Sequence, residues 1–465
     1  MEWNELLSKK RFKEEQKNDI VYRNDYDTII CSTLFRRLQD KAQVFPLDDD
    51  DYVRTRLTHS LEVSAIGKKL GEYVFGTIKK MKIDDWFDTH TEKDFSDVLL
   101  CAGLIHDIGN PPFGHFGEYA IREWFQTNLD RLFLGRRKIT EILTKWQLQD
   151  LYSFEGNAQS LRLLSKTPYL GRKDGFNLSY EVLGTIMKYP ISSEALKNDN
   201  PNQYKKTGYN FSERELFEDI NHTMGMNGNR HPLSYLLEAA DDIAYRTSDL
   251  EDAMVKKVIN FQQITDMLQQ DKIGFNDKDI CRNDIRTCTD RLLGIYQEEL
   301  LKNGRKPELT AVQRWNQHIQ GMMIKDAGDA FIKNYEQIMQ GTFKGNLFEH
   351  TVSGYLILAV SELSERLIYT SSIKTRTELF GRRVIDSLLG QFMPAAIVYD
   401  TEEQITFIEQ RTMDTVSEFY KSMYHSEADG KCEQEKLYLR LLMITDYISG
   451  MTDNYAKRLY QELFA

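Results

Sequence analysis

A His-Asp dipeptide stands at the end of a strongly apolar stretch, in the segment LIHDIGN at residues 104–110. An ionised carboxylate at the end of a buried helix is costly unless it is paired or bound to a metal. His106 and Asp107 could both reach one cation if this helix end faces a cavity. Alone, the dipeptide is weak evidence, because an ordinary helix C-terminus explains it better.

A second histidine, His59, lies in the segment RTRLTHSLE at residues 54–62. It falls near the start of an amphipathic helix that we predict over residues 58–80, with Thr58 as the capping residue. Taken alone, such a histidine more often caps a helix or makes a hydrogen bond inside a core. Its interest lies in its combination with the dipeptide.

Three polar residues fall on one stripe of a third predicted helix. Asp241, Tyr245 and Asp249 are spaced at i, i+4 and i+8, which places them on one helix face. The stripe continues Leu233 and Leu237, so it is expected to point into the protein. Three polar groups on an inward face need a function.

Two imidazoles and two carboxylates suit a divalent cation, with coordination positions left for water and phosphate. Mn²⁺ and Mg²⁺ are the first choices, and Fe, Co and Ni are also compatible with this set. We interpret the neighbouring acids Asp242 and Asp252 as exposed surface residues, although Asp242 is a rival to Asp241 as a ligand.

The elements that position these residues are expected to be helices. Prolines are few, nine in 465 residues, and long proline-free stretches favour helices. Residues 191–231 are rich in Asn, Gly and Lys, which predicts loops over a surface or cleft. The predicted helices cover residues 27–43, 58–80, 94–108, about 117–124, 232–255 with Pro232 in the first turn, and much of 256–465 with a break near Asn303–Pro307.

Composition excludes some classes of protein. The net charge of −11 argues against a dedicated nucleic-acid binder, so an anionic substrate has to be met by local bases or a metal. The five cysteines lack CxxC pairing, which indicates reduced thiols rather than a disulfide framework. The charged N-terminus has no apolar signal core, and the apolar runs are too short to cross a bilayer. We expect a cytoplasmic protein with no membrane partner.

The motifs together resemble the HD superfamily and, more narrowly, the deoxyguanosine triphosphate triphosphohydrolase (dGTPase) family. The matching segments occur in family order over nearly the whole chain. They are FRRLQDKAQVF (35–45), RTRLTHSLEV (54–63), HDIGNPPFGHFGE (106–118), FEGNAQSLRLL (154–164), EAADDIAYRTSDLED (238–252) and ITDYISGMTDNYA (444–456). The chain departs from the pattern at Ala42, where the family has threonine, and at 26–28, which replaces a more basic stretch. Neither departure removes a predicted ligand.

The resemblance implies a fold class and a domain organisation. The fold is mostly α, with an HD-domain helical core and an extended all-helical C-terminal region. Residues 1–255 would form the N-terminal segment and the catalytic core. Residues 256–465 would form a helical region that packs on the core and is not independent.

The resemblance also assigns roles to individual residues. It implies one divalent metal ion per active site, and Asp241 rather than Asp242 as a ligand, because only Asp241 has tyrosine four residues on and aspartate eight on. His115 and Glu118 resemble the family's catalytic His–acid dyad, in which the carboxylate orients the imidazole that handles the proton of the attacking water. The implied metal ligands are His59, His106, Asp107 and Asp241.

The substrate-binding residues follow from the same resemblance. Asp249 would accept a hydrogen bond from the 3′-hydroxyl, and the ring of Tyr245 would crowd the 2′ position and exclude ribonucleotides. The assignment of Lys206 to phosphate binding comes mainly from the resemblance. The adjacent Lys205 is a rival for this role, and lysines in polar loops are usually only solvated. The full implied set is Gln43, Val44, Arg56, Asn157, Lys188, Tyr189, Lys206, Tyr245 and Asp249.

The expected reaction is metal-dependent hydrolysis of dGTP, or of other dNTPs, to deoxynucleoside and inorganic triphosphate. Two alternatives are another HD phosphohydrolase, such as a nucleotidase or phosphodiesterase, and a nucleotide-binding HD protein without catalysis. Two-metal members of the superfamily use extra histidines, and here His222 and His231 lie in a predicted loop without that pattern. The resemblance further suggests a homo-oligomer, a hexamer built from dimers, and a dNTP or single-stranded DNA effector.

Overall fold

The computed structural model describes residues 1–13, 20–48, 50–169, 175–198, 200, 204–269, 282–302 and 305–464. Nearly all of its elements are helices, which confirms the mostly α prediction. Within these ranges the only strands are β1 (Phe133–Leu134) and β2 (Arg137–Lys138). They form an antiparallel hairpin in which Phe133 pairs with Lys138.

Three long helices make the centre of the fold. The helix α4 (Arg56–Met81) packs along α6 (Glu92–Ile105), and α14 (Pro232–Val255) packs against both. A Cβ atom on Gly103 of α6 would lie 2.6 Å from the Cα of Ser64, so only glycine allows α4 and α6 to approach this closely. This approach brings the start of α4 beside the C-terminal end of α6.

Shorter helices surround this centre in the first part of the chain. They are α1 (Trp3–Leu6), α2 (Val21–Cys31), α3 (Thr33–Arg37), η1 (Leu38–Asp40), α5 (Trp86–Thr89), α7 (Gly114–Asn128), η2 (Leu129–Arg131), α8 (Ile139–Ile142), α9 (Lys145–Tyr152), α10 (Gly156–Lys166), α11 (Tyr180–Ile186), α12 (Ser193–Asn198), η3 (Phe211–Glu213) and α13 (Arg214–Thr223).

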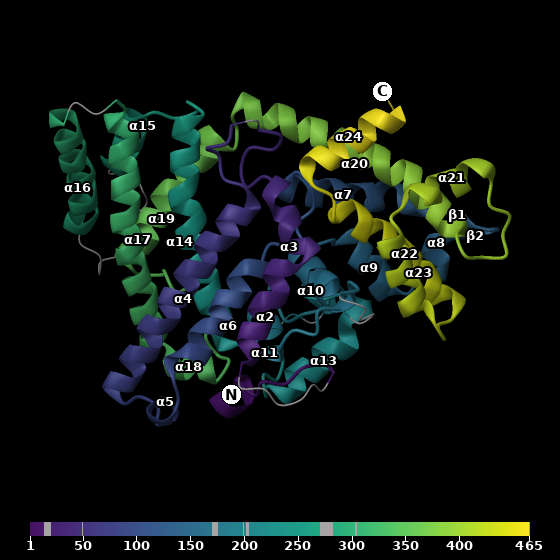
Figure 1. Cartoon of the computed structure of the whole chain (residues 1–465), viewed down its shortest axis with the longest axis horizontal. Helices are drawn as coiled ribbons and strands as arrows, with labels where there is room; N and C mark the ends of the chain where they lie inside the picture. The colour runs from purple at the N-terminus through teal and green to yellow at the C-terminus, as the bar shows by residue number, and fades with distance from the viewer. Residues whose placement is uncertain are drawn as a thin grey trace.

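The helices after residue 255 lie on two sides of this centre, with α15, α16, α17 and α19 on one side and α21, α22 and α23 beside the hairpin on the other (Figure 1). Their bounds are α15 (Phe261–Gln269), α16 (Arg282–Leu301), α17 (Pro307–Lys333), α18 (Tyr335–Met339), α19 (Val352–Leu363), the π-helical turn η4 (Ser364–Ile368), α20 (Ser372–Val398), α21 (Phe407–Thr415), α22 (Glu418–Ala428), α23 (Glu433–Ser449) and α24 (Asp453–Phe464).

The hydrophobic residues form two buried clusters, and each draws on both halves of the sequence. One includes side chains from Trp3 to Ile368, among them those of α4, α6, α14 and α17. The other joins residues of 113–154 to residues of 384–459. Helix α20 packs against α7 of the first half and against α23 and α24 of the second. The division at residue 255 stays a prediction.

Several predicted boundaries differ from the structure. Thr58 does not cap α4: Thr55 is the capping residue, and its backbone N–H donates to Thr58 Oγ1 at 3.1 Å within the first turn. The predicted helix over 27–43 is broken at Ser32, whose hydroxyl caps the separate helix α3 through Phe35 N–H. The predicted loop region 191–231 contains α12, η3 and α13. Helix α13 is stabilised by one apolar face, which consists of Leu216, Phe217 and Ile220.

Other expectations hold. Helix α14 begins at Pro232, as predicted, and α16 ends before the predicted break, with residues 303 and 304 outside the described part of the chain. Cys31, Cys101 and Cys432 are free thiols, and Cys281 lies outside the described residues. Over the ranges that the structure covers, no helix combines the length and apolar character needed to cross a membrane.

Candidate functional site

A cavity of about 620 Å³ opens where α4, the end of α6, the start of α7 and the middle of α14 meet. Segments from both halves of the sequence complete its walls, including residues 42–46 and the turn after η4. The residues singled out by the sequence that line it are Gln43, Val44, Arg56, His59, His106, Asp107, His115, Asn157, Lys188, Tyr189, Lys206, Asp241, Tyr245 and Asp249. Glu118 lies behind His115.

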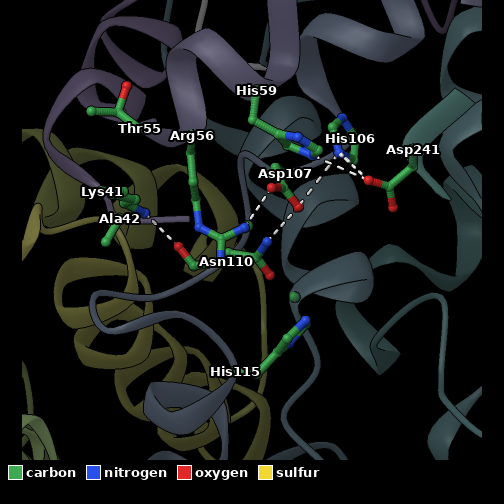
Figure 2. Close-up of polar contacts among 12 residues, drawn as sticks. Lys41, Ala42, Thr55, Arg56, His59, His106, Asp107, Asn110, His115 and Asp241 are labelled. Carbon is green, nitrogen blue, oxygen red and sulfur yellow. Dashed lines mark hydrogen bonds and ion pairs between the residues drawn. The ribbon is translucent and has the colours of Figure 1, made fainter. Parts of the chain in front are cut away.

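Three of the four predicted metal ligands meet in one group. His59 Nε2 lies 3.1 Å from Asp241 Oδ1, and His106 Nε2 lies 3.7 Å from the same oxygen. One ligand atom from each side chain lies within 4.8 Å of the others, so the group could hold a metal ion. Figure 2 shows the two imidazoles and the carboxylate pointing toward one another.

The hydrogen bonds of His106 prepare its ring for a cation. Its Nδ1 lies 2.8 Å from the carbonyl oxygen of Gly103, which can only accept, so Nδ1 carries the proton. Its Nε2 is buried and, among the described residues, has no hydrogen-bond partner. An imidazole fixed in this way by a backbone carbonyl is the usual arrangement of a metal-binding histidine. The donor set therefore fits a divalent cation.

Asp107 lies at the edge of this group. Its Oδ1 is 3.7 Å from His106 Nε2, while Arg56 contacts Oδ2 and the amide of Asn110 donates to Oδ1. Burial alone would raise the pKa of Asp107, but the Arg56 guanidinium lowers it well below the ordinary range. Asp107 is thus held as an anion beside the two histidines, and its role as fourth ligand stays a prediction.

His115 and Glu118 form the predicted pair at the start of α7. His115 Nδ1 lies 3.0 Å from Glu118 Oε2, and the other carboxylate oxygen accepts from the backbone N–H of Gly156 at 2.9 Å. The imidazole is 75% exposed and lines the cavity, whereas Glu118 is 2% exposed. Burial would raise the pKa of Glu118, but its hydrogen bond with His115 lowers it. The carboxylate therefore orients the ring from behind.

Two lysines of the cavity are each paired with a carboxylate, of which Glu155 is buried and Glu238 is partly exposed. Lys188 Nζ lies 2.7 Å from Glu238, and Lys206 Nζ lies 2.9 Å from Glu155. Burial would lower the pKa of Lys188, but Glu238 raises it, and the pKa of Glu238 falls to about 2 despite its own burial, chiefly through Arg230. Both lysines are therefore charged groups aimed at the cavity.

The rival Lys205 is exposed and does not line this cavity. It lines a smaller neighbouring pocket instead. The structure thus separates the two adjacent lysines, which the sequence alone does not.

Another side of the cavity carries Gln43, Tyr245 and Asp249. Gln43 Oε1 and Asp249 Oδ1 are buried and, within the described ranges, have no hydrogen-bond partner. Asp249 Oδ2 accepts from the hydroxyl of Tyr369 at 2.8 Å. Burial raises the pKa of Asp249 to about 6, and burial also raises that of Tyr245. Two oxygen acceptors are therefore available to a bound molecule.

Tyr369 is a cavity residue that sequence reasoning missed. It directly follows the π-helical turn η4, in a part of the chain without a chemistry-bearing motif. Glu365, Lys374 and Glu378 from the same region also line the cavity. A π-helical turn frequently accompanies a functional site, but it cannot be seen in a single sequence.

The predicted exposure of Asp242 and Asp252 is wrong. Asp242 lines the cavity with 18% of its side chain exposed, and burial raises its pKa to about 6. Asp252 is buried and forms an ion pair of 2.7 Å with Arg54. The arginine explains Asp252, because a buried carboxylate needs such a partner.

The two histidines considered as extra ligands, His222 and His231, do not join this group. His231 caps α14, where its Nδ1 accepts from Leu233 N–H, and burial lowers its pKa to about 4. His222 lies on α13 and is exposed. Neither lines the cavity.

Comparison with known proteins agrees with this geometry. Residues 56–160 match the HD domain, and residues 364–462 match the phosphohydrolase-associated domain. A deoxyguanosinetriphosphate triphosphohydrolase-like protein of Listeria innocua is 42% identical over 100% of this chain and 99% of its own.

More distant relatives also match along nearly their whole length. A protein of Synechocystis with the same name is 32% identical over 100% of this chain and 99% of its own. A deoxyguanosinetriphosphate triphosphohydrolase of Yersinia enterocolitica is 31% identical over 96% and 94%. The chain therefore belongs to the deoxyguanosinetriphosphate triphosphohydrolase family of HD-domain phosphohydrolases.

Proposed function

We propose that the protein hydrolyses dGTP, and other dNTPs to a degree set by the pocket, to the deoxynucleoside and inorganic triphosphate in a metal-dependent reaction. One observation carries this proposal. One cavity is lined by the imidazole–carboxylate group, by His115 with Glu118 behind it, and by two lysines that are each paired with a carboxylate. The names of the relatives support the guanine preference.

The proposed metal ligands are His59, His106, Asp107 and Asp241. A bound Mn²⁺ or Mg²⁺, the first choices over Fe, Co and Ni, would polarise the α-phosphate and offset charge that develops there. Arg56 would assist, because it already contacts Asp107 and lines the same wall.

His115 is the proposed proton acceptor for the attacking water. A carboxylate can only accept hydrogen bonds, so its contact with Glu118 places the ring proton on Nδ1 and leaves Nε2 free to accept. Figure 2 shows His115 across an open space from the group formed by His59, His106 and Asp241. An α-phosphate in that space would lie between the two. Water attack at phosphorus would break its bond to the 5′-oxygen, so that triphosphate keeps the water oxygen. The 5′-oxygen would leave as the hydroxyl of the deoxynucleoside, with the proton that His115 accepted from the water.

The triphosphate would bind at Lys188, Tyr189, Lys206, Arg56 and Asn157. In the free protein Glu238 and Glu155 compensate the two lysines. A polyphosphate can take over these contacts, because charge-assisted hydrogen bonds to phosphate are strong. Without a glycine-rich phosphate loop, the side chains and the metal have to supply this binding.

The sugar would lie against Gln43, Val44, Tyr245 and Asp249. The free Oδ1 of Asp249 supports its role as acceptor for the 3′-hydroxyl. The Tyr245 ring would occupy the space that a 2′-hydroxyl needs. A site of this kind rejects ribonucleotides because the added group clashes or is buried without a partner.

Further properties stay predictions. They are the cytoplasmic location, a homo-oligomer with a hexamer as first choice, and regulation by a dNTP or single-stranded DNA. A nucleotidase or phosphodiesterase would give different products, and a binding protein without catalysis would give none, so one assay separates the alternatives.

The test is an incubation of the purified protein with each of the four dNTPs and with GTP, in Mn²⁺ or Mg²⁺, with products resolved by ion exchange. We expect deoxynucleoside and triphosphate, fastest from dGTP and absent with His106→Ala. Monophosphate plus pyrophosphate, or no turnover with any dNTP mixture, would contradict the proposal.

A further inference from the structure

Three segments far apart in the sequence meet behind the wall of the cavity: residues 41–42, residues 110–113 and residues 449–453. The buried carboxylate of Asp453 joins two of them to the start of α24. Its Oδ1 accepts from Phe113 N–H at 2.9 Å, and its Oδ2 accepts from Ala42 N–H at 3.1 Å. The side chain is 2% exposed, so solvent does not replace these bonds.

A buried lysine completes the same junction. Lys41 Nζ donates to the carbonyl oxygens of Asn110 and of Ser449, the latter at 2.8 Å. Figure 2 shows Lys41 reaching Asn110 from the segment that also carries Ala42. The amino group of Lys41 and the carboxylate of Asp453 thus link the end of α23 and the start of α24 to both walls.

The first wall is the turn that carries His115. Phe113 has φ +65° and Gly114 has φ +62°, and α7 starts at this point. A bulky residue in the left-handed region is strained and persists only where its surroundings hold it. The bond from Phe113 N–H to Asp453 is one such restraint. His115, two residues on, depends on this turn for its position.

The second wall is the segment that leads into Gln43 and Val44. Ala42 pairs with Thr55 in an isolated antiparallel bridge, and Arg56 N–H donates to Lys41 O at 2.8 Å. Restraining Ala42 therefore restrains the position of Gln43 relative to the start of α4. One carboxylate therefore accepts a hydrogen bond from each wall.

We propose that Asp453 is a positioning residue of the active site, through which α24 holds the His115 turn and the Gln43 segment in register. This proposal rests on the proposed function for its kinetic consequence but not for its structural one. It also gives a purpose to the sequence motif at residues 444–456, which lies outside the cavity.

The first test is Asp453→Asn, compared with Asn454→Ala as a control on the same turn of α24, where an exposed side chain contacts Asp40. The asparagine side chain has one carbonyl oxygen, so it can accept from only one of the two N–H groups, that of Ala42 or that of Phe113. We expect the amide protons of Ala42 and Phe113 to exchange faster in the Asp453 variant. In the folded enzyme kcat should fall by about 10²-fold, as for a small misplacement of catalytic groups.

A second pair of variants reaches the same turn from α20. A Cβ atom on Gly381 would lie 2.6 Å from the Phe113 ring, whereas one on Gly390 meets nothing within 4 Å. Gly381→Ala should therefore reduce kcat, and Gly390→Ala on the same helix should not. This pair remains informative if Asp453→Asn does not fold.

Binding of Mn²⁺ separates positioning from general damage, because none of the three grouped ligands lies in either wall. The Asp453 and Gly381 variants should bind Mn²⁺ as the wild type does. The proposal is overturned if exchange at Ala42 and Phe113 is unchanged, or if folded variants keep wild-type kcat and KM. If the wild type has no triphosphohydrolase activity, only the proposed function fails, since the exchange and Mn²⁺ results still decide the structural role.

Discussion

Glu118→Gln is the sharpest test of the proposed proton transfer. In the wild type, Glu118 accepts from His115 Nδ1–H at 3.0 Å and from Gly156 N–H at 2.9 Å. A glutamine can keep the second bond with its carbonyl oxygen, but it then presents an N–H to His115 Nδ1. The ring proton would move to Nε2, so that the nitrogen facing the cavity could no longer accept.

The loss should match that of a general base, about 10²- to 10⁴-fold in kcat. This range corresponds to about 3 to 5 kcal/mol of activation free energy. KM for dGTP and the affinity for Mn²⁺ should change little, because His59, His106 and Asp241 are untouched. Thermal stability should change modestly, since the two charge-assisted hydrogen bonds of the carboxylate are replaced by neutral ones.

The assay is steady-state kinetics with triphosphate detection, alongside thermal melting and Mn²⁺ titration. Glu123→Gln is the matched control. Glu123 lies on the same helix, and its partly exposed carboxylate forms an ion pair with Arg382. A Glu118→Gln enzyme with kcat within about threefold of the wild type would refute the reasoning, because a lost general base costs far more.

Three further predictions concern the sugar site, pH and the metal. Tyr245→Ala should weaken the preference for dGTP over GTP by about tenfold or more, as measured by the ratio of kcat/KM values, and an unchanged ratio would show that the ring does not exclude the 2′-hydroxyl. Burial raises the pKa of Asp150 to about 7, so the folded protein favours the protonated side chain. The resulting stabilisation of the folded protein is present at low pH and is lost as pH rises from about 4 to 7. The unfolding free energy of the wild type, less that of the Asp150→Asn variant, should therefore fall by up to about 1.4 kcal/mol per pH unit in that window. Denaturant titrations measure this difference, and a difference that does not change with pH would contradict the burial argument. Mn²⁺ at a hundredfold excess over its Kd should stabilise the wild type by about 2.7 kcal/mol but not His106→Ala, and equal thermal shifts in both would place the metal elsewhere.

The sequence predicted the central helices, and the residues it singled out on the third of them line one cavity, for a physical reason. The spacing of Asp241, Tyr245 and Asp249 along a stripe continued by Leu233 and Leu237 indicates one inward face, and α14 presents all three polar residues to the cavity. Such periodicity is a local property of the chain. The pairing of His59 with the helix end at His106 was predicted from the motif combination and could not come from periodicity alone.

Other features depend on distant partners and could not be predicted. The burial of Asp252 is explained only by Arg54, some two hundred positions away in the sequence. Tyr369 reaches Asp249 from the position directly after a π-helical turn, which has no local sequence signal. The cap at Thr55 was misplaced by three residues because Thr58, a similar residue, also takes part in the first turn.

The fate of the water oxygen tests the central claim most directly. Hydrolysis of dGTP in water labelled with heavy oxygen, with products analysed by mass spectrometry, shows which bond breaks. The account predicts one label in inorganic triphosphate and none in deoxyguanosine, because water attacks the α-phosphorus and the 5′-oxygen leaves. Label in a monophosphate, in pyrophosphate or in the nucleoside would contradict it.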